Sequence, residues 1–149
     1  MKVKIQYVNS PEEECAVLRI YKGHPEIIKL QEIIENETYK SIILPCFLGE
    51  EKYSISCEHI LFIETIQEKS FVHTGKKIYD VKKRLYELEE ILPEEFVRIS
   101  KSAIMNLKQV EHYSPLANGL MKAVFYNGEE TYISRKYLRL LRAKIGGKN

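Results

Sequence analysis

Long hydrophobic runs are absent from this chain of 149 residues. None approaches the ~18 apolar residues that a membrane span needs. The first residues alternate between polar and apolar types and lack the apolar block of a secretory signal. Cysteine is also scarce. The sequence has three, Cys15, Cys46 and Cys57, and they are widely spaced and odd in number. This usage excludes a disulfide framework and predicts reduced, buried thiols in a cytoplasmic protein.

The motifs of common enzyme classes are missing as well. The sequence has no glycine-rich phosphate loop, no His-Glu-x-x-His motif and no recognisable pair of catalytic carboxylates. Ser100 and Ser102 have no histidine or aspartate at a spacing known from nucleophilic catalysis. Cys57 and His59 are potential metal ligands, but a metal site needs further partners, so a packed thiol beside a surface histidine is favoured. We therefore expect no enzyme, no metal and no cofactor.

Charged residues, by contrast, make up 30% of the chain and are distributed unevenly. Residues 1–95 hold 13 lysines and arginines against 18 acidic residues, whereas residues 96–149 hold 10 against 3. The net charges of the two parts are therefore −5 and +7. This asymmetry predicts that a polyanion docks on the C-terminal third. A solvated basic face on a helix explains the charge equally well.

The first 43 residues are predicted to form a small strand-strand-helix element. Residues 2–7 alternate as in a half-buried strand, residues 15–21 are apolar enough for a second strand, and Pro25 opens a helix. The apolar stripe of that helix consists of Ile27, Leu30 and Ile34. The stripe is either core or a dimer contact, so we expect a regulatory or dimerising role.

Residues 44–146 are predicted to be mostly antiparallel strands with helices, an α+β fold. Strands are expected at residues 42–48, 53–57, 60–63, 71–74, 78–79, 110–113, 120–126 and 130–133. The Asn127-Gly128 pair is a strong hairpin signal. One helix is expected from Asp80 to Leu92, where Pro93 stops it. A last helix follows Ser134 as its cap, with Leu138, Leu141 and Ile145 facing inward.

The most informative stretch is residues 96–106, where apolar residues surround the polar side chains of Arg98, Ser100, Lys101 and Ser102. This pattern predicts a strand that leaves the core, exposes a basic corner and returns. Arginine and lysine supply charge to such a corner, and serine supplies a compact donor for phosphates or base edges. Asn106 is expected to satisfy backbone groups at a strand end.

Two arginine assignments complete the candidate site. Arg98 either contacts DNA, supports the contacting loop, or pairs with a carboxylate near Glu94 or Glu95. At the start of the last helix the Ser134-Arg135-Lys136-Tyr137 sequence repeats the basic theme. Arg135, Arg139 and Arg142 share one outward face of that helix, because they lie at helical spacing.

Five of these segments, in this order, resemble the LytTR DNA-binding domain family of bacterial regulators. They are residues 60–64, 85–89, 96–106, 127–128 and 134–137. The resemblance implies an elongated, mostly antiparallel β fold with one central helix and no helix-turn-helix. It implies DNA contact by loops and strand ends that enter successive major grooves. The implied contact regions are Lys69 with Ser70, the corner from Arg98 to Ser102, and Arg135 with Lys136.

The sequence departs from the family pattern at two places. Some relatives carry a histidine in the first contact loop, where this chain has Lys69 and Ser70. Better-known members also carry a phosphoryl-accepting receiver domain, which needs an acidic cluster. Here Asp80 is the single aspartate and fewer than fifty residues precede the domain. The chain is thus similar to stand-alone members, whose genes often lie beside one for a small membrane protein, a partner that only the resemblance implies.

The sequence therefore predicts a bacterial, cytoplasmic transcriptional regulator that binds specific double-stranded DNA as a homodimer on direct repeats. Lys101 and Arg135 are expected to reach base edges, while Lys69, Arg139 and Arg142 hold phosphates. The alternative is an RNA-binding or protein-interaction module, because tyrosines beside basic residues can stack on unpaired bases. Those tyrosines are Tyr113, Tyr126, Tyr132 and Tyr137.

Overall fold

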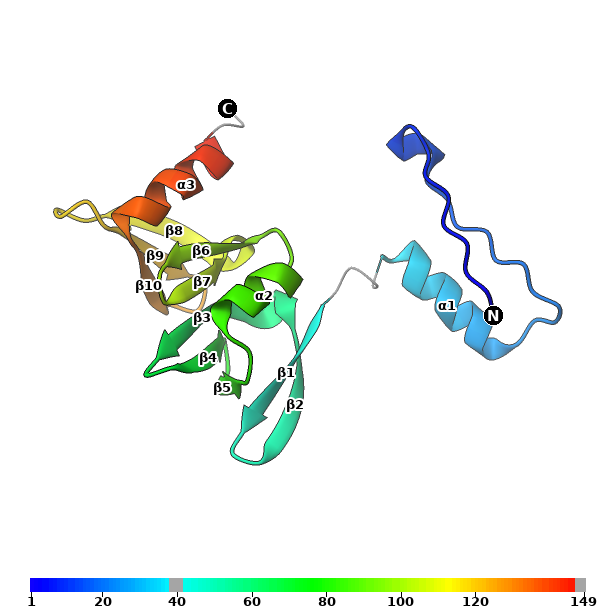
Figure 1. Ribbon diagram of the computed structural model, residues 1–149, viewed down its shortest axis with the longest axis horizontal. Helices are drawn as coiled ribbons and strands as arrows, with labels where there is room; N and C mark the ends of the chain where they lie inside the picture. The colour runs from blue at the N-terminus through cyan, green and yellow to red at the C-terminus, as the bar shows by residue number, and fades with distance from the viewer. Residues whose placement is uncertain (38–41, 147–149) are drawn as a thin grey trace. The chain divides into compact units, whose positions relative to one another are not determined.

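The computed structural model describes the backbone of residues 1–37 and 42–146, and side chains as far as residue 143. The chain divides into two compact units, Met1–Lys40 and Ser41–Asn149 (Figure 1). The predicted boundary, after residue 43, is slightly later in the sequence than this division. Ile43 already belongs to the first strand of the second unit.

The described residues 1–37 of the N-terminal unit contain one α-helix, α1 (Pro25–Glu35), and a short 3-10 helix, η1 (Pro11–Glu13). Proline at the first helical position explains where α1 begins, because its fixed φ suits that position and its missing N–H costs no bond there. The helix prediction is confirmed. The two strands predicted at residues 2–7 and 15–21 are wrong, since residues 1–37 contain no strand. Two short segments alone are marginal as a sheet in water, whatever their alternation.

The second unit contains a seven-stranded antiparallel sheet with the strand order β2-β1-β5-β4-β3-β7-β6. Its strands are β1 (Ile43–Leu48), β2 (Glu51–Ser56), β3 (Ile60–Ile66), β4 (Lys69–Thr74), β5 (Ile78–Val81), β6 (Phe96–Ser100) and β7 (Ala103–Asn106). A second sheet, in the order β10-β9-β8, is formed by β8 (Val110–Pro115), β9 (Met121–Phe125) and β10 (Glu130–Ile133). The predicted mostly β, α+β fold is confirmed.

The described part of this unit also contains the helices α2 (Leu85–Ile91) and α3 (Arg135–Gly146) and the 3-10 turns η3 (Cys57–His59) and η4 (Leu107–Gln109). The hairpin predicted across Asn127-Gly128 is present as β9 paired with β10. Gly128 has a φ of +90°, which glycine adopts without a Cβ penalty.

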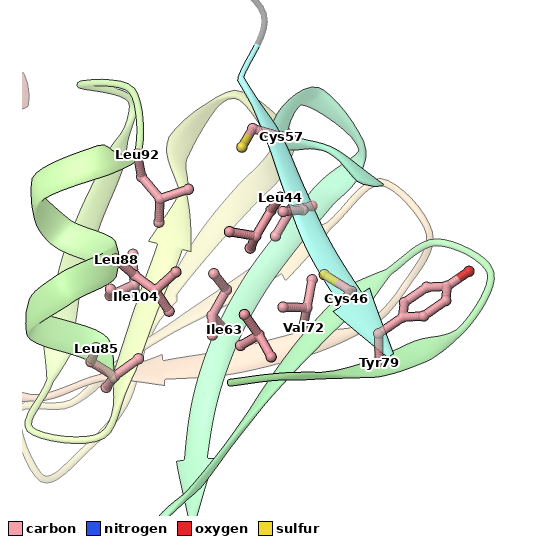
Figure 2. Packing of buried hydrophobic residues seen from close by; sticks show 12 residues of the cluster. Leu44, Cys46, Cys57, Ile63, Val72, Tyr79, Leu85, Leu88, Leu92 and Ile104 are labelled. Carbon is pink, nitrogen blue, oxygen red and sulfur yellow. The ribbon is translucent and has the colours of Figure 1, made fainter. Parts of the chain in front are cut away.

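Strands β3 and β7 separate two hydrophobic clusters, so their side chains are buried on both faces. Ile63 and Ile104 pack with Leu85, Leu88 and Leu92 in the first cluster (Figure 2). On the other side of the same strands, Phe62 and Met105 belong to a second cluster with β8, β9, β10 and α3. Leu138 and Leu141 of α3 are buried there as predicted, whereas the side chain of Ile145 lies outside the described residues.

Two further predictions about this unit are corrected. The helix expected from Asp80 begins only at Leu85, because Asp80 and Val81 pair with β4 instead. The polar loop expected at residues 67–70 is a tight turn of Gln67 and Glu68, and Lys69 already starts β4.

The cysteines are all free, as predicted, but only Cys46 and Cys57 are buried. Cys15 is exposed, because the N-terminal unit buries none of its described side chains.

Candidate nucleic-acid interface

The β3–β4 turn and the β6–β7 turn lie side by side at one end of the large sheet. Thr65 near the end of β3 donates its backbone N–H to the carbonyl of Ser102, with an N···O distance of 2.8 Å. On the other side, Thr65 pairs with Ser70 of β4, and their hydroxyl oxygens are 3.1 Å apart. Thr65 therefore links the first two predicted contact regions. Nothing in the local sequence marks Thr65 as part of the site.

The β6–β7 turn forms the basic corner that the sequence predicted. Lys101 and Ser102 are exposed at its tip. The turn is fixed from within, because Ser102 donates its backbone N–H to Ser100 Oγ at 3.1 Å. The strand register shifts between Arg98 and Ser100, since Ile99 is fully buried in the second cluster. This bulge turns the polar residues away from the core.

Arg98 points its donors inward. Its Nε donates to the carbonyl of Ser100 at 2.8 Å and its Nη2 to the carbonyl of Lys101 at 2.5 Å. Its Nη1 lies 3.1 Å from Oε1 of Glu89 on α2. Of the predicted alternatives, Arg98 therefore supports the loop and pairs with a carboxylate. The partner is Glu89 of α2, which precedes the predicted Glu94 and Glu95 in the sequence.

Helix α3 begins next to the same corner. Ser134 donates its backbone N–H to the carbonyl of Ile99 at 2.9 Å, which ties the helix start to β6. The four basic side chains of the helix that were predicted to contact DNA are all exposed: Arg135, Lys136, Arg139 and Arg142. With Gly119 and Leu138, the three arginines line a shallow hollow of about 260 Å³.

A small residue is required at the β8–β9 turn that faces this hollow. Gly119 has a φ of +81°, and a Cβ there would lie 3.1 Å from side-chain atoms of Arg135.

Three guanidinium groups around a hollow suit a phosphate, because arginine binds phosphate oxygens through paired donors.

The charges at this end of the sheet have no ion-pair partner among the described residues. Among residues 1–37 and 42–143, no ion pair involves Lys69, Lys101 or the arginines of α3. Lys69 is exposed in β4, whereas Ser70 is only 6% exposed and directs its hydroxyl to Thr65. The predicted contact residues thus separate into exposed cations and residues that hold the turns. Ser70 and Arg98 direct their polar groups inward, and Ser100 and Ser102 bond to each other within the β6–β7 turn.

Asn106 and Cys57, which the sequence also singled out, have roles in the packing and hydrogen bonding of the fold. Asn106 donates its Nδ2–H to the carbonyl of Ile60 at 2.9 Å and accepts the backbone N–H of Lys108, so its predicted backbone role is confirmed. Cys57 is buried, which raises its pKa to about 11, and His59 beside it is exposed. The predicted packed thiol beside a surface histidine is confirmed. No group of potential metal ligands occurs within the described part of the chain.

Comparison with known proteins identifies the family of this chain. The family model of the LytTr DNA-binding domain matches residues 50–146. The chain belongs to the LytTR family. Membership makes it a DNA-binding protein and not an enzyme, as the sequence predicted. The described residues include no helix long and apolar enough to cross a membrane.

Relatives and a solved structure agree with the LytTR assignment. An uncharacterized HTH-type transcriptional regulator of Staphylococcus aureus strain NCTC 8325 is 32% identical over 110 residues, covering 74% of this chain and 75% of the relative. The counterpart in strain MRSA252 is 31% identical over the same length and covers the same shares of both chains. The LytTr DNA-binding domain of a putative methyl-accepting/DNA response regulator from Bacillus cereus has the same fold. Its TM-score is 0.67 at 21% identity, over 70% of this chain and 96% of that one.

The helices of this LytTR domain do not form a helix-turn-helix. In the described part of the second unit, five strands separate α2 from α3. The exposed cations instead lie on turns, on a strand start and on α3 beside the sheet. This arrangement agrees with the expected use of loops and strand ends.

Proposed function

We propose that this chain is a transcriptional regulator that binds specific sequences in double-stranded DNA. The observation that carries the proposal is the meeting of the predicted contact regions at one end of the sheet. Two backbone hydrogen bonds hold them there, from Thr65 to Ser102 and from Ser134 to Ile99. The S. aureus relatives bear the name of transcriptional regulators, which supports the regulatory part of the proposal.

Short turns and a helix start are suited to the major groove, where base edges carry a unique pattern of donors and acceptors. We assign Lys101 and Arg135 to base edges because each is exposed at the tip of a rigidly held element. Arg139, Arg142 and Lys69 are assigned to phosphates, with Lys136 beside them. Arg98 and the serines at positions 70, 100 and 102 hold these elements in place. Ser102 is also exposed at the tip of the corner, where its hydroxyl can donate to DNA.

One such domain gives a modest interface of roughly 600–1,000 Å² on DNA. Two copies on direct repeats would bind more tightly, because the second copy binds at a raised effective concentration. We therefore propose a homodimer on DNA, in the bacterial cytoplasm where the chromosome lies.

We also propose that the N-terminal unit contacts protein. Residues 1–37 bury no side chain, and Val3, Ile5, Tyr7, Val17 and Ile28 are exposed. An apolar surface of this kind suits a second copy, or the small membrane protein that the family resemblance implies. A variant that lacks residues 1–40 tests this role, since both hydrophobic clusters lie in the second unit. Unchanged self-association and unchanged DNA binding in that variant would remove the N-terminal unit from the proposal.

Selection of bound duplexes from a random DNA library tests the main proposal without knowledge of the operator. We expect enrichment of a short motif repeated in the same direction, and a Kd for that duplex at least 10³-fold below that for a scrambled one. Single-stranded DNA and RNA of the same sequence serve as competitors. Equal binding to all of these, or no enriched motif, would favour the alternative module with stacking tyrosines.

A further inference from the structure

Strand β5 carries basic residues at both of its ends. Lys76 and Lys77 precede it, and the basic segment of Lys82, Lys83 and Arg84 follows it. All five side chains are exposed. Neither group belongs to the contact regions described above, and both lie in the part of the sequence with a net negative charge.

The register of the sheet distinguishes the two ends. Val81, at the end of β5, pairs with Ser70, so the basic segment that follows it lies beside the start of β4 at Lys69. His73 pairs with Ile78, so Lys76 and Lys77 lie at the opposite end of the same strands. Of the two basic groups that flank β5, the segment at residues 82–84 is therefore the one at the end of the sheet that carries the corner.

The strands β5, β4, β3, β7 and β6 are consecutive neighbours in the sheet. At a spacing of ~4.8 Å between strands, the row from the basic segment to the β6–β7 corner is roughly 20 Å long. The row contains Lys82, Lys69 and Lys101. In the β3–β4 and β6–β7 turns that belong to the row, Glu68 is the one exposed carboxylate. A positive row of this length exceeds the width of a major groove, which is about 12 Å, so its ends can reach the phosphates that border the groove.

The basic segment is also free to bind. Among the described residues, no ion pair involves Lys82, Lys83 or Arg84. Lys82 Nζ lies 4.4 Å from the centroid of the Phe47 ring, which steadies its side chain without removing its charge.

We propose that residues Lys82, Lys83 and Arg84 form a fourth DNA contact, to backbone phosphates next to those bound by Lys69. The proposal rests on the proposed DNA-binding face. Phosphate contacts fix the position of a protein on the duplex and carry no direct sequence information. The basic segment therefore strengthens binding to every sequence alike and makes it more sensitive to salt.

The chain offers a matched pair of charge-removing variants. Lys82→Gln/Lys83→Gln removes two charges at the DNA-facing end of β5, and Lys76→Gln/Lys77→Gln removes two charges at the far end. The readout is the slope of log affinity against log salt for the full-length protein on a selected duplex and on a scrambled one. We expect the first variant to lower the slope by about 1.8, because each lost phosphate contact lowers it by about 0.9. The ratio of affinities for the two duplexes stays constant.

The control variant should leave the slope unchanged, since charges beyond the Debye length of ~10 Å at 0.1 M salt are screened. An equal fall in both variants would show that the lysines act only through net charge, and no fall in the first variant would remove the contact. Arg84→Gln tests the segment separately, and circular dichroism checks that each variant is folded. Equal affinity of the wild type for the selected and the scrambled duplex would instead contradict the proposed function. The salt slopes of the variants would still report on the fourth contact.

Discussion

Arg98 on β6 and Glu89 on α2 form an ion pair with 3.1 Å between Nη1 and Oε1. The remaining donors of the same guanidinium bind the carbonyls of Ser100 and Lys101, the residues that form the corner. Arg98 thus connects the corner that presents Lys101 to the helix that covers the first hydrophobic cluster. We therefore expect Arg98 to act on DNA binding through the shape of the corner.

Arg98→Ala should lower both stability and DNA affinity. Hydrogen bonds to charged groups contribute about 1.5–3 kcal/mol, so we expect a loss of about 1–3 kcal/mol in the free energy of unfolding. Glu89→Gln should cost less than about 1 kcal/mol, because the Glu89 side chain is 41% exposed and its ion pair is screened by solvent. Urea unfolding and binding isotherms measure both effects. If Arg98→Lys retains full DNA affinity, charge matters more than the fork of donors.

The corner itself could be predicted because its sequence is local. The alternation in residues 96–106 sets which side chains are buried, and the two-residue turn between β6 and β7 exposes Lys101 and Ser102. The final helix and its basic face were likewise visible from 3.6-residue spacing. The family motifs then joined these local features into one fold.

The features that were missed depend on pairing between distant parts of the chain. Val81 has a helix-like spacing from the apolar Leu85, yet Asp80 and Val81 pair with β4 and belong to strand β5. Ser70 was assigned to a loop, but its hydroxyl is buried against Thr65 across the β3–β4 hairpin. The basic segment at residues 82–84 was hidden by the acidic composition around it, and only the register places it beside Lys69.

Asn106→Ala should destabilise the protein without changing its sequence preference. The side chain is 1% exposed and bonds to the carbonyl of Ile60 and the N–H of Lys108, so its loss leaves buried backbone groups unpaired. Such a loss costs about 1–3 kcal/mol. Thermal unfolding measures the cost, and affinities for selected and scrambled duplexes measure specificity. A fall in specificity with intact folding would mean that Asn106 is closer to DNA than its burial indicates.

Stability should fall as pH rises through the range where the buried thiols titrate. Burial raises the pKa of Cys46 and of Cys57 from 9.0 to about 11. Between these values the unfolded state binds fewer protons than the folded state, so each thiol lowers the free energy of unfolding by up to about 1.4 kcal/mol per pH unit. Below pH 9 both states are protonated and the stabilisation is complete.

Urea unfolding under reducing conditions at pH 8, 9 and 10 tests this dependence. Because lysines and tyrosines titrate nearby, the informative quantity is the difference between the wild type and a Cys46→Ala/Cys57→Ala variant. We expect the two stabilities to converge as pH rises. Parallel curves would show that the thiols are hydrated in the folded state. The exposed Cys15 should react with a thiol reagent at neutral pH before either buried cysteine does.

Lys101→Ala and Arg135→Ala should narrow the gap in affinity between selected and scrambled duplexes. A good base contact provides about 1–3 kcal/mol of discrimination, so each variant should lose roughly 5- to 150-fold in specificity. Arg142→Ala should leave the gap nearly intact and lower the salt slope by about one, since a phosphate contact weakens binding to all sequences alike. All three side chains are exposed and lie outside the hydrophobic clusters, so the variants are expected to fold. Binding isotherms at two salt concentrations on both duplexes separate the two classes. Unchanged specificity in the first two variants, with a changed salt slope, would move Lys101 and Arg135 to the phosphates and leave base readout to other residues of the corner.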